Sequence, residues 1–470
     1  MAVILLVSIA LYNSWKPLPE DISLKGQSYS VMEEDIEFLF DLTYHNKNGE
    51  KVIEQNIFDT WFELVQAAER FIIIDAFLFN NDYGIKEEHV PLTDQLKNKL
   101  ISKREENPKI EITFITDPIN DFYGSYQSKE LQDLKDSGIK VIVTDLTKLR
   151  DSNPYYSSVW RLFLQWFGTR GEGWIPHPLN ARDKKVTLRS FLSLLNTKAN
   201  HRKLLVADHG DEIWTIVSSG NPHTASSLHS NIAFLIKDKL WKDALKAEGA
   251  VAEMSGQTVE IPDTDFVKEK SAGDSVSAQF LTEGKIKEGL SRDIGSLTKG
   301  DSLDIAVFYL SDRNVIKRII KAYQRGVRVR LILDPNKDAF GREKNGIPNR
   351  QVVYEIFRET AGNLPIRWYD TRGEQFHTKL IILRKSNNVL IYSGSANLTR
   401  RNISDLNLES NIKVSIPSDS KLALEISNYF ERIWENKDGK YTLSPDSFKE
   451  DSQFKYWLYR FQEATGFSSF

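Results

Sequence analysis

The chain contains the same four short segments twice, in the same order. Each copy has an apolar strand, a second strand ending in Asp-Pro, a third strand, and a His-x-Lys sequence that opens an apolar run. These segments begin near residues 71, 110, 138 and 200 in the first copy, and near 303, 327, 364 and 376 in the second. Four matches in a constant order indicate an internal duplication.

Strands that alternate with helical segments predict an α/β unit with a mixed sheet, here present twice. We expect the two units to pack about a pseudo-two-fold axis. The predicted organisation is an N-terminal apolar segment at 1–30, a first unit at 31–254 with an insert at 148–199, a linker at 255–274, and a second unit at 275–470. The second unit ends in a predicted amphipathic helix, with Phe454, Trp457, Leu458 and Phe461 on one face.

The N-terminal segment is almost wholly apolar from residue 2 to residue 11. A membrane-spanning helix needs about 20 such residues. No basic region precedes the segment, and no small-residue cleavage site follows it, so a complete signal peptide fits poorly. Two interpretations stay open: the end of a membrane anchor or a buried N-terminal strand. We favour the anchor, because Trp15, Lys16 and two prolines follow the apolar run, as they do where a segment leaves a bilayer.

Composition excludes several classes of function. The chain has 62 Lys and Arg against 65 Asp and Glu, so it is not a basic nucleic-acid binder overall. It has no cysteine, which excludes disulfides, thiol catalysis and Cys-ligated zinc.

The repeated His-x-Lys sequences can carry phosphoryl chemistry. Alternate residues of a strand share a face, so His201 and Lys203 point the same way, as do His377 and Lys379. A pseudo-two-fold axis would bring both pairs into one cleft. One imidazole could then attack phosphorus while the other protonates the leaving oxygen, and the lysines would neutralise the phosphoryl oxygens.

These motifs resemble those of the phospholipase D superfamily. His201-Arg-Lys203, followed after four residues by Asp208, resembles the HxK(x4)D signature of that family. In the second copy, His377-Thr-Lys379, the segment 394–397 (GSAN) and the segment 407–409 (NLE) resemble its HxK…GSxN…NxE pattern. The resemblance covers roughly residues 50–435 and is strongest for bacterial phosphatidyltransferases of the cardiolipin-synthase type.

The resemblance implies a role for each matched residue. His201 and His377 would be nucleophile and general acid; the sequence leaves their order open, and by analogy we assign the attack to His201. Lys203 and Lys379 would bind phosphate, and Glu409 would accept a hydrogen bond from a catalytic imidazole. No metal and no cofactor is expected.

Further residues of the two turns are assigned by matching the copies. We match Asn221 with Ser395 and His223 with Asn397, and assign all four to phosphate binding. We place His229 opposite Glu409 and Asn231 opposite Asn411, and assign His229, Asn231, Asn411 and Asp208 to supporting roles. Arg384 stands where the second copy should have the counterpart of Asp208. Either this aspartate is a structural partner that one half needs, which we favour, or the second half is weakened.

The resulting hypothesis is a phosphodiesterase or phosphatidyltransferase that acts on phospholipids through a covalent phospho-histidine. Its partners would be a phospholipid and, as acceptor, water, an alcohol or a second lipid. The resemblance also implies association with a bacterial cell membrane. The aromatic stripe at 160–167 either packs on the first unit, which we favour, or lies at a bilayer interface or an acyl channel. The alternatives are a metal-independent nuclease, disfavoured by the balanced charge, and a degenerate lipid-binding or scaffold module.

Overall fold

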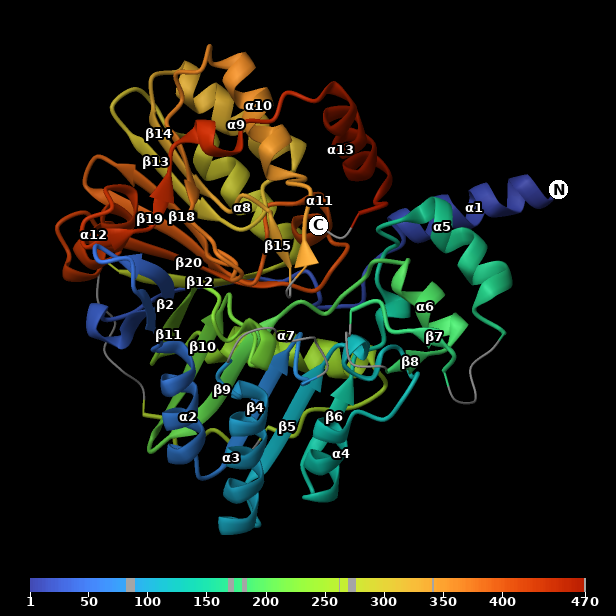
Figure 1. Ribbon diagram of the computed structural model, residues 1–470. Coiled ribbons are helices and arrows are strands. Elements are labelled where there is room, and N and C mark those ends of the chain that lie inside the picture. Colours follow the sequence, from blue (N-terminus) through green and yellow to red (C-terminus); the bar gives the residue numbers. More distant parts are fainter. Residues whose placement is uncertain are drawn as a thin grey trace.

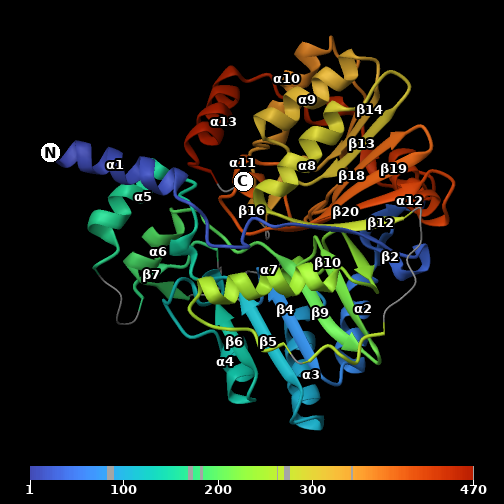
Figure 2. The ribbon, with the colours of Figure 1, turned by 180° about the vertical axis from the view of Figure 1, so that it is seen from behind.

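Two mixed β-sheets with the same strand order form the framework of the protein, as the duplication predicts (Figures 1 and 2). In this computed structural model the described residues are 1–81, 89–167, 173–179, 184–261, 263–268, 276–339 and 342–468. Parts of four predicted segments therefore lie outside the described residues: 82–88 of the first unit, 168–172 and 180–183 of its insert, 262 and 269–274 of the linker, and 275, 340–341 and 469–470 of the second unit.

The first sheet has the order β21-β2-β11-β10-β9-β4-β5-β6, with β3 paired to β2. Its strands are β21 (Gly439–Lys440), β2 (Ile36–Asn46), β11 (Asn231–Ile236), β10 (Glu212–Ser218), β9 (Lys203–His209), β4 (Phe71–Ala76), β5 (Glu111–Thr116), β6 (Lys140–Val143) and β3 (Lys51–Glu54). Strands β4, β5 and β6 are parallel, and the other pairings are antiparallel.

The second sheet repeats this order as β1-β12-β20-β19-β18-β13-β14-β17-β22. Its strands are β1 (Lys25–Ser30), β12 (Ser277–Thr282), β20 (Ser410–Pro417), β19 (Asn388–Gly394), β18 (Lys379–Lys385), β13 (Ser302–Val307), β14 (Arg328–Leu333), β17 (Ile366–Tyr369) and β22 (Thr442–Leu443). The two His-x-Lys strands, β9 and β18, hold equivalent central positions. The predicted α/β class with two mixed sheets is confirmed.

Helices cover the outer face of each sheet, and the inner faces pack together. The outer helices are α2 (Ile57–Ala67), α3 (Leu92–Glu106) and α4 (Lys129–Asp136) on the first sheet, and α8 (Glu283–Gly295), α9 (Arg313–Gln324) and α10 (Asn349–Glu359) on the second. One apolar core joins the inner faces, including Val206 of β9 and Ile382 of β18, with α7 (Trp241–Met254) and α12 (Lys421–Trp434) at its margins. This shared core fixes the two His-x-Lys strands relative to each other.

Each sheet takes one edge strand from the other end of the chain. Strand β1, near the N-terminus, pairs with β12 of the second sheet, and β21, near the C-terminus, pairs with β2 of the first. The predicted linker lies between the end of α7 at Met254 and the start of β12 at Ser277. The unit boundaries themselves remain a prediction.

The N-terminal apolar segment forms a helix, α1 (Ala2–Trp15), that projects from the body beside α5 (Pro154–Val159) (Figures 1 and 2). The alternative of a buried N-terminal strand is wrong, because the segment is helical and most of its described side chains are exposed. Among the described residues, no helix is both long and apolar enough to cross a membrane.

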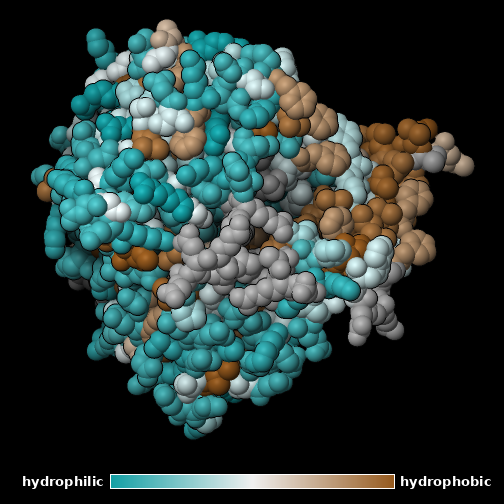
Figure 3. Space-filling model, in the orientation of Figure 1, coloured by the Kyte–Doolittle hydropathy of each residue, from teal (hydrophilic) through white to brown (hydrophobic). Residues whose placement is uncertain are grey.

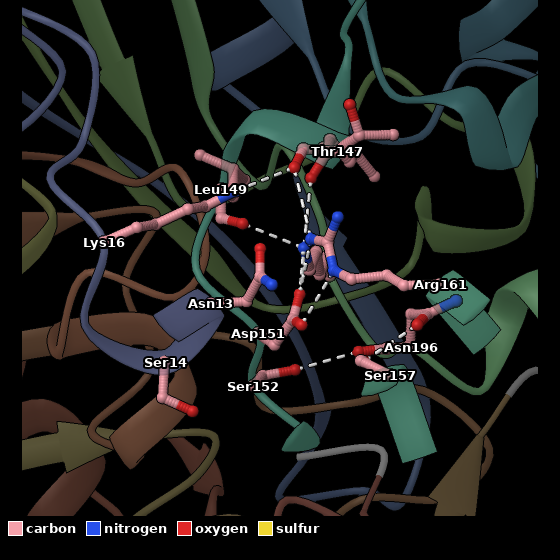
Figure 4. Close-up of polar contacts among 12 residues, drawn as sticks. Asn13, Ser14, Lys16, Thr147, Leu149, Asp151, Ser152, Ser157, Arg161 and Asn196 are labelled. Atoms are coloured by element: carbon pink, nitrogen blue, oxygen red, sulfur yellow. Dashed lines mark hydrogen bonds and ion pairs between the residues drawn. The ribbon is translucent and has the colours of Figure 1, made fainter. Parts of the chain in front are cut away.

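Polar contacts dock α1 on the insert (Figure 4). The backbone N–H of Asp151 donates to the Asn13 carbonyl at 2.9 Å, and Lys16 Nζ donates to the Thr147 carbonyl at 2.9 Å. The Asp151 carboxylate accepts from Arg161 Nε at 3.0 Å and pairs with Lys198 Nζ at 2.6 Å. The N-terminal helix and the insert are thus one connected substructure.

The insert and the C-terminal helix leave aromatic side chains in solvent. The insert contains α5, the π-helical turn η4 (Trp160–Leu164), β7 (Ile175–Pro176), β8 (Lys185–Val186) and α6 (Leu188–Leu194). Trp166 is 69% exposed and Phe167 72%, so our preferred interpretation, that this stripe packs on the first unit, is wrong for these rings. In α13 (Gln453–Thr465), Tyr456 and Tyr459 face the core, while Phe454, Trp457 and Phe461 face outward. Figure 3 shows apolar surface gathered on this side of the molecule.

Candidate active site

Both motif histidines line one cavity of about 630 Å³ between the two units. His201 lies two residues before the start of β9, and His377 two residues before the start of β18. Because β9 and β18 are central strands whose sheets share a core, both imidazoles are brought from opposite units to the same space. The rings rest on equivalent aromatic side chains: His201 on Phe77, with centroids 4.8 Å apart, and His377 on Phe308, at 5.1 Å.

A carboxylate from the opposite unit orients His201. The Nδ1 atom of His201 lies 3.0 Å from the carboxylate of Glu409, which is fully buried. A carboxylate without a proton only accepts, so Nδ1 carries the hydrogen and Nε2 keeps its lone pair. Glu409 also accepts from Ser395 Oγ and from Asn402 Nδ2. Three donors therefore hold this carboxylate in place.

An amide takes the equivalent position beside His377. The Nδ1 atom of His377 lies 3.0 Å from Asn231 Oδ1, which also accepts from Ser219 Oγ at 3.1 Å. Asn231 Nδ2 donates to the His229 carbonyl at 3.0 Å, which fixes the orientation of the amide. Each imidazole is thus held through Nδ1 by the other unit, but only His201 faces a charged partner.

The strand registers correct the predicted match between the two turns. Leu204 pairs with Val217 in the first hairpin, and Leu380 pairs with Ser393 in the second. Counting on from these pairs, Asn221 corresponds to Asn397. The predicted matches of Asn221 with Ser395 and of His223 with Asn397 are wrong by two residues, because Gly220 and Gly394 occupy different positions of equivalent turns.

The predicted counterpart of Glu409 in the first unit is also wrong by two residues. Val217 pairs with Phe234, and Ser393 pairs with Ile412, which makes Asn231 the counterpart of Glu409. The predicted match of His229 with Glu409, and hence that of Asn231 with Asn411, is wrong. His229 lines the cavity with its ring centroid 6.1 Å from that of His377, and Asn411 Oδ1 accepts from the Ala396 N–H at 3.1 Å.

The predicted phosphate ligands divide into two groups. Asn221 and Asn397 line the cavity, and the Oδ1 of each is buried with no hydrogen-bond partner among the described residues. Ser395 is fully buried and its hydroxyl donates to Glu409. His223 is also fully buried, and its Nδ1 lies 2.9 Å from Ser226 Oγ. Among the four, therefore, the two asparagines face the cavity.

The two motif lysines are buried beneath the histidines. Lys203 Nζ donates to the His201 carbonyl at 2.7 Å, and Lys379 Nζ donates to the His377 carbonyl at 2.9 Å. Burial lowers the pKa of Lys203 to about 7 and, together with repulsion from Lys203, lowers that of Lys379 well below its ordinary value. The lowered pKa values mean that burial disfavours the charged form of both lysines, and an anion in the adjacent space would stabilise it.

The histidine pKa values have the same cause. Burial lowers the pKa of His201 to about 4, opposed by the attraction of Glu409. Burial and then Lys379 and Lys203 lower the pKa of His377 well below its ordinary value. Burial likewise lowers the pKa of His223 and of His229 to about 3. These lowered pKa values favour the neutral form of all four imidazoles at pH 7.

Asp208 has a structural position at the far end of β9. Its carboxylate accepts from the backbone N–H groups of Glu69, Arg70 and Phe71, at 3.0, 2.8 and 2.8 Å. In the second unit, Arg384 pairs with Asp304 and donates to Ser427 Oγ at 3.0 Å. This geometry agrees with the interpretation that the motif aspartate anchors one hairpin and is replaced by a different ion pair in the other.

Several supporting residues were not identified from the sequence. Asp117 and Asp334, the aspartates of the repeated Asp-Pro, accept from the backbone N–H groups of residues 200 and 376, directly before the histidines, at 2.7 and 2.8 Å. Glu283 accepts from the Glu409 N–H at 2.9 Å and pairs with Arg202 across the unit interface at 2.8 Å. The Asp-Pro repeat was the signal for the first pair; nothing local marked Glu283.

The remaining cavity wall is cationic on one part and apolar on another. No aspartate or glutamate is among the cavity residues that the structure describes, whereas Lys198, Lys344 and Arg401 are. The apolar wall comes from both units, the insert and the C-terminal segment: Phe77, Leu78, Ile119, Leu179, Leu194, Leu195, Phe308 and Phe467. Such a cavity is complementary to an anion that carries apolar groups.

This fold and site define a duplicated α/β protein. Its two His-x-Lys sequences share one cavity that favours an anion. Residues 294–434 match the family described as cardiolipin synthase, PLD-like domain. The mitochondrial cardiolipin hydrolase of Chlamydomonas reinhardtii is 27% identical over 142 residues, which are 30% of this chain and 54% of that protein. The chain thus spans about half the length of this curated relative. In its second unit the chain is thus similar to the PLD-like domain of that family.

The fold as a whole is similar to a solved enzyme structure. The phosphatidylserine synthase of Haemophilus influenzae Rd KW20 superposes with a TM-score of 0.57 over 97% of this chain and 97% of that chain, at 12% sequence identity. The similarity extends over both units, so the duplication belongs to the shared fold.

Proposed function

We propose that the protein is a phosphodiesterase or phosphatidyltransferase that cleaves phospholipids through a covalent phospho-histidine. The observation that carries the proposal is the cavity that both imidazoles line, which has an apolar side and no carboxylate among its described wall residues. The two buried motif lysines lie next to these histidines, each donating to the carbonyl of its own motif histidine. A phosphodiester fits the cationic part, and acyl chains fit the apolar part.

In the first step, Nε2 of His201 attacks phosphorus and the P–O bond to the leaving group breaks. Glu409 fixes the Nδ1–H tautomer and stabilises the positive charge that the ring acquires. His377, protonated at Nε2 once the anionic substrate has entered, donates that proton to the leaving oxygen. Its Nδ1 partner is the neutral amide of Asn231, which makes the imidazolium a stronger acid than one paired with a carboxylate.

In the second step, water or an alcohol attacks phosphorus, and the P–N bond to His201 breaks. His377, now neutral, takes the proton of the attacking hydroxyl, which restores both rings to their initial states. Lys203, Lys379 and the amides of Asn221 and Asn397 would hold the phosphoryl oxygens throughout. Water gives phosphatidic acid, and the glycerol hydroxyl of a second lipid gives a diphosphatidyl product.

We further propose that the enzyme works at a membrane surface through an apolar rim. This rim comprises the exposed apolar side chains of α1, of 155–167 in the insert, of α13, and Leu195 and Phe467. Leu195 and Phe467 also line the cavity, and Phe467 stacks on Phe461 of α13 with ring centroids 6.5 Å apart. The rim is therefore continuous with the cavity wall, so a lipid could pass from one to the other without crossing water.

Charge next to the apolar rim favours an anionic bilayer. Lys148 and Lys185 are exposed on the insert, and Arg189 is half-buried. Asp151, the acidic residue within the described part of the insert, is neutralised by Arg161 and Lys198. Basic side chains beside exposed Trp and Phe are the composition of surfaces that bind the headgroup region of acidic membranes.

Turnover of phosphatidylglycerol vesicles by the full chain tests the proposal. We expect His201→Ala and His377→Ala each to lower turnover by about 100-fold or more, since each removes a nucleophile or a general acid. The matched control is His209→Ala, at the other end of β9 and outside the cavity residues, which should retain turnover. With phosphorus-labelled lipid, an acid-labile, base-stable protein adduct should form in the wild type and in His377→Ala but not in His201→Ala.

The outcomes separate the competing functions. Full turnover in either cavity histidine variant contradicts the two-histidine mechanism. Cleavage of DNA with no lipid turnover favours the nuclease, and lipid binding without turnover or adduct favours the non-catalytic module. Phosphatidic acid as the product indicates hydrolysis, whereas a diphosphatidyl product indicates transfer.

A further inference from the structure

Three cations on the cavity wall lie outside both His-x-Lys motifs, and one of them, Lys198, is neutralised by Asp151. The other two are Arg401 and Lys344. Arg401 belongs to α11 (Arg400–Ile403), and Lys344 precedes α10. Both line the cavity that contains His201 and His377. Neither is assigned a task by the two-step mechanism, which uses the buried lysines of the motifs for the scissile phosphate.

The adjacent residue Arg400 has a structural role, because its guanidinium binds backbone carbonyls of two other segments. Arg400 Nε donates to the Glu463 carbonyl at 3.1 Å, and its Nη2 donates to the Ser152 carbonyl at 2.9 Å. These bonds tie α13 and the insert to α11. Arg400 is absent from the described cavity wall, so the two consecutive arginines have different surroundings.

Arg401 is only partly satisfied by the protein. Its Nη2 donates to the carbonyls of Gly466 and Ser468 and to Ser468 Oγ, but its Nε is buried with no hydrogen-bond partner among the described residues. No ion pair with a carboxylate accompanies it within the described ranges; Glu463, which attracts it from further away, accepts instead from Ser311 Oγ at 2.8 Å. Burial lowers the pKa of Arg401 to about 10. A half-buried guanidinium whose Nε is buried and unpaired among the described residues favours an anion beside it.

Tyr309 joins Arg401 to Lys344. Lys344 Nζ donates to the Tyr309 hydroxyl, and the same tyrosine is among the groups that interact electrostatically with Arg401. Lys344 also lies 5.8 Å from the centroid of Phe308, the ring that packs on His377. Lys344 thus lies on the His377 side of the cavity, where the mechanism places the leaving group or the acceptor, and Tyr309 lies near enough to Arg401 to interact with its charge.

We propose that Arg401 and Lys344 form a second anion subsite, which binds a phosphate of the lipid headgroup other than the phosphate that reacts. This inference rests on the proposed function and names its substrate class: phospholipids with a second phosphate, with diphosphatidylglycerol as the probe. The arginine supplies a planar pair of donors, and the lysine supplies a point charge. The scissile phosphodiester stays between the imidazoles, and the second phosphate defines which headgroup is accepted.

The test compares diphosphatidylglycerol with phosphatidylcholine, each at low mole fraction in neutral detergent micelles, for the full chain. We expect the ratio of kcat/KM for the two lipids to fall about tenfold in Arg401→Gln and in Lys344→Gln, mainly through KM for diphosphatidylglycerol. Arg401→Lys, which keeps the charge, should restore part of the ratio. The matched control is Lys317→Gln, which removes an exposed charge on α9, outside the cavity residues.

Each outcome supports or overturns the subsite. An equal loss on both lipids means that Arg401 holds the scissile phosphate or the fold, and an unchanged ratio means that it binds no lipid anion; either overturns the inference. Inorganic phosphate separates free from lipid-borne anion: relief of phosphate inhibition in Arg401→Gln with an unchanged lipid ratio assigns the site to free phosphate and also overturns it. Absence of wild-type turnover on both lipids is a failure of the proposed function, whereas turnover without the ratio change is a failure of the subsite alone.

Discussion

Replacing Glu409 with glutamine tests how the opposite unit prepares His201. The carboxylate receives three donors on its two oxygens, from His201 Nδ1, Ser395 Oγ and Asn402 Nδ2. Glutamine has one acceptor oxygen, so its NH₂ group must face at least one of these donors. A hydrogen bond to a charged group is worth about 1.5–3 kcal/mol. If about 2 kcal/mol of this is lost from the transition state, kcat/KM falls about 30-fold.

The pH profile separates this effect from a general loss of structure. In the proposed mechanism attack requires neutral His201, so kcat/KM should rise with pH through the pKa of this ring, which burial lowers to about 4 against the attraction of Glu409. Without the negative charge, the pKa of His201 falls further. The acidic limb of the profile should therefore move to lower pH in Glu409→Gln, although the plateau is lower.

The assay is initial-rate hydrolysis of phosphatidylglycerol micelles from pH 3.5 to 8, with thermal unfolding measured in parallel. Glu253→Gln, a carboxylate-to-amide change at an exposed position of α7, is the matched control and should behave as the wild type. A rate within threefold of the wild type at every pH, or an acidic limb displaced to higher pH in a folded variant, would refute the role of Glu409.

Four further outcomes follow from the geometry. Asn231→Asp places a negative charge 3.0 Å from His377 Nδ1, which should raise the pKa of this ring and move the basic limb of kcat/KM to higher pH; an unmoved limb contradicts its role as general acid. Burial lowers the pKa of Lys203 to about 7, so the unfolded chain binds more protons between about pH 7 and 10; the Tm should rise with pH across this interval unless inorganic phosphate is present. Asp208→Asn weakens the bonds to three backbone N–H groups and should lower the free energy of unfolding by about 1–3 kcal/mol, while the folded fraction keeps its KM. Trp166→Ala with Phe167→Ala should weaken sedimentation with phosphatidylglycerol vesicles several-fold but leave turnover of short-chain monomeric lipid unchanged; equal vesicle binding contradicts the apolar rim.

The duplication and the α/β class could be predicted from the sequence, because strand-forming runs and the His-x-Lys pairs recur in order and need no knowledge of long-range contacts. The correct match between the residues of the two turns could not be predicted from the sequence. Gly220 and Gly394 look equivalent along the chain. The hydrogen-bonded pairing of each hairpin decides which residues correspond, however, and it places the two glycines at different positions. The shared Ser-x-Asn of residues 219–221 and 395–397 was the better signal.

Other features depend on contacts between distant segments. The sequence shows that α1 and α13 are rich in apolar residues. It does not show which of these residues stay exposed, because that depends on the segments that pack against each helix. The difference between Arg400 and Arg401 is likewise invisible in a dipeptide, because it arises from carbonyls of the insert and the C-terminal segment.

The exchange of β1 and β21 between the sheets has a consequence for synthesis on the ribosome. The first sheet receives β21 only after residues 439 and 440 have been translated, although its other strands end at residue 236. His201 likewise acquires its partner Glu409 only after most of the second unit has been translated. A nascent chain that has completed the first His-x-Lys sequence therefore still lacks the carboxylate that orients its histidine. If the proposed mechanism holds, a product terminated before residue 409 would be inactive on lipids.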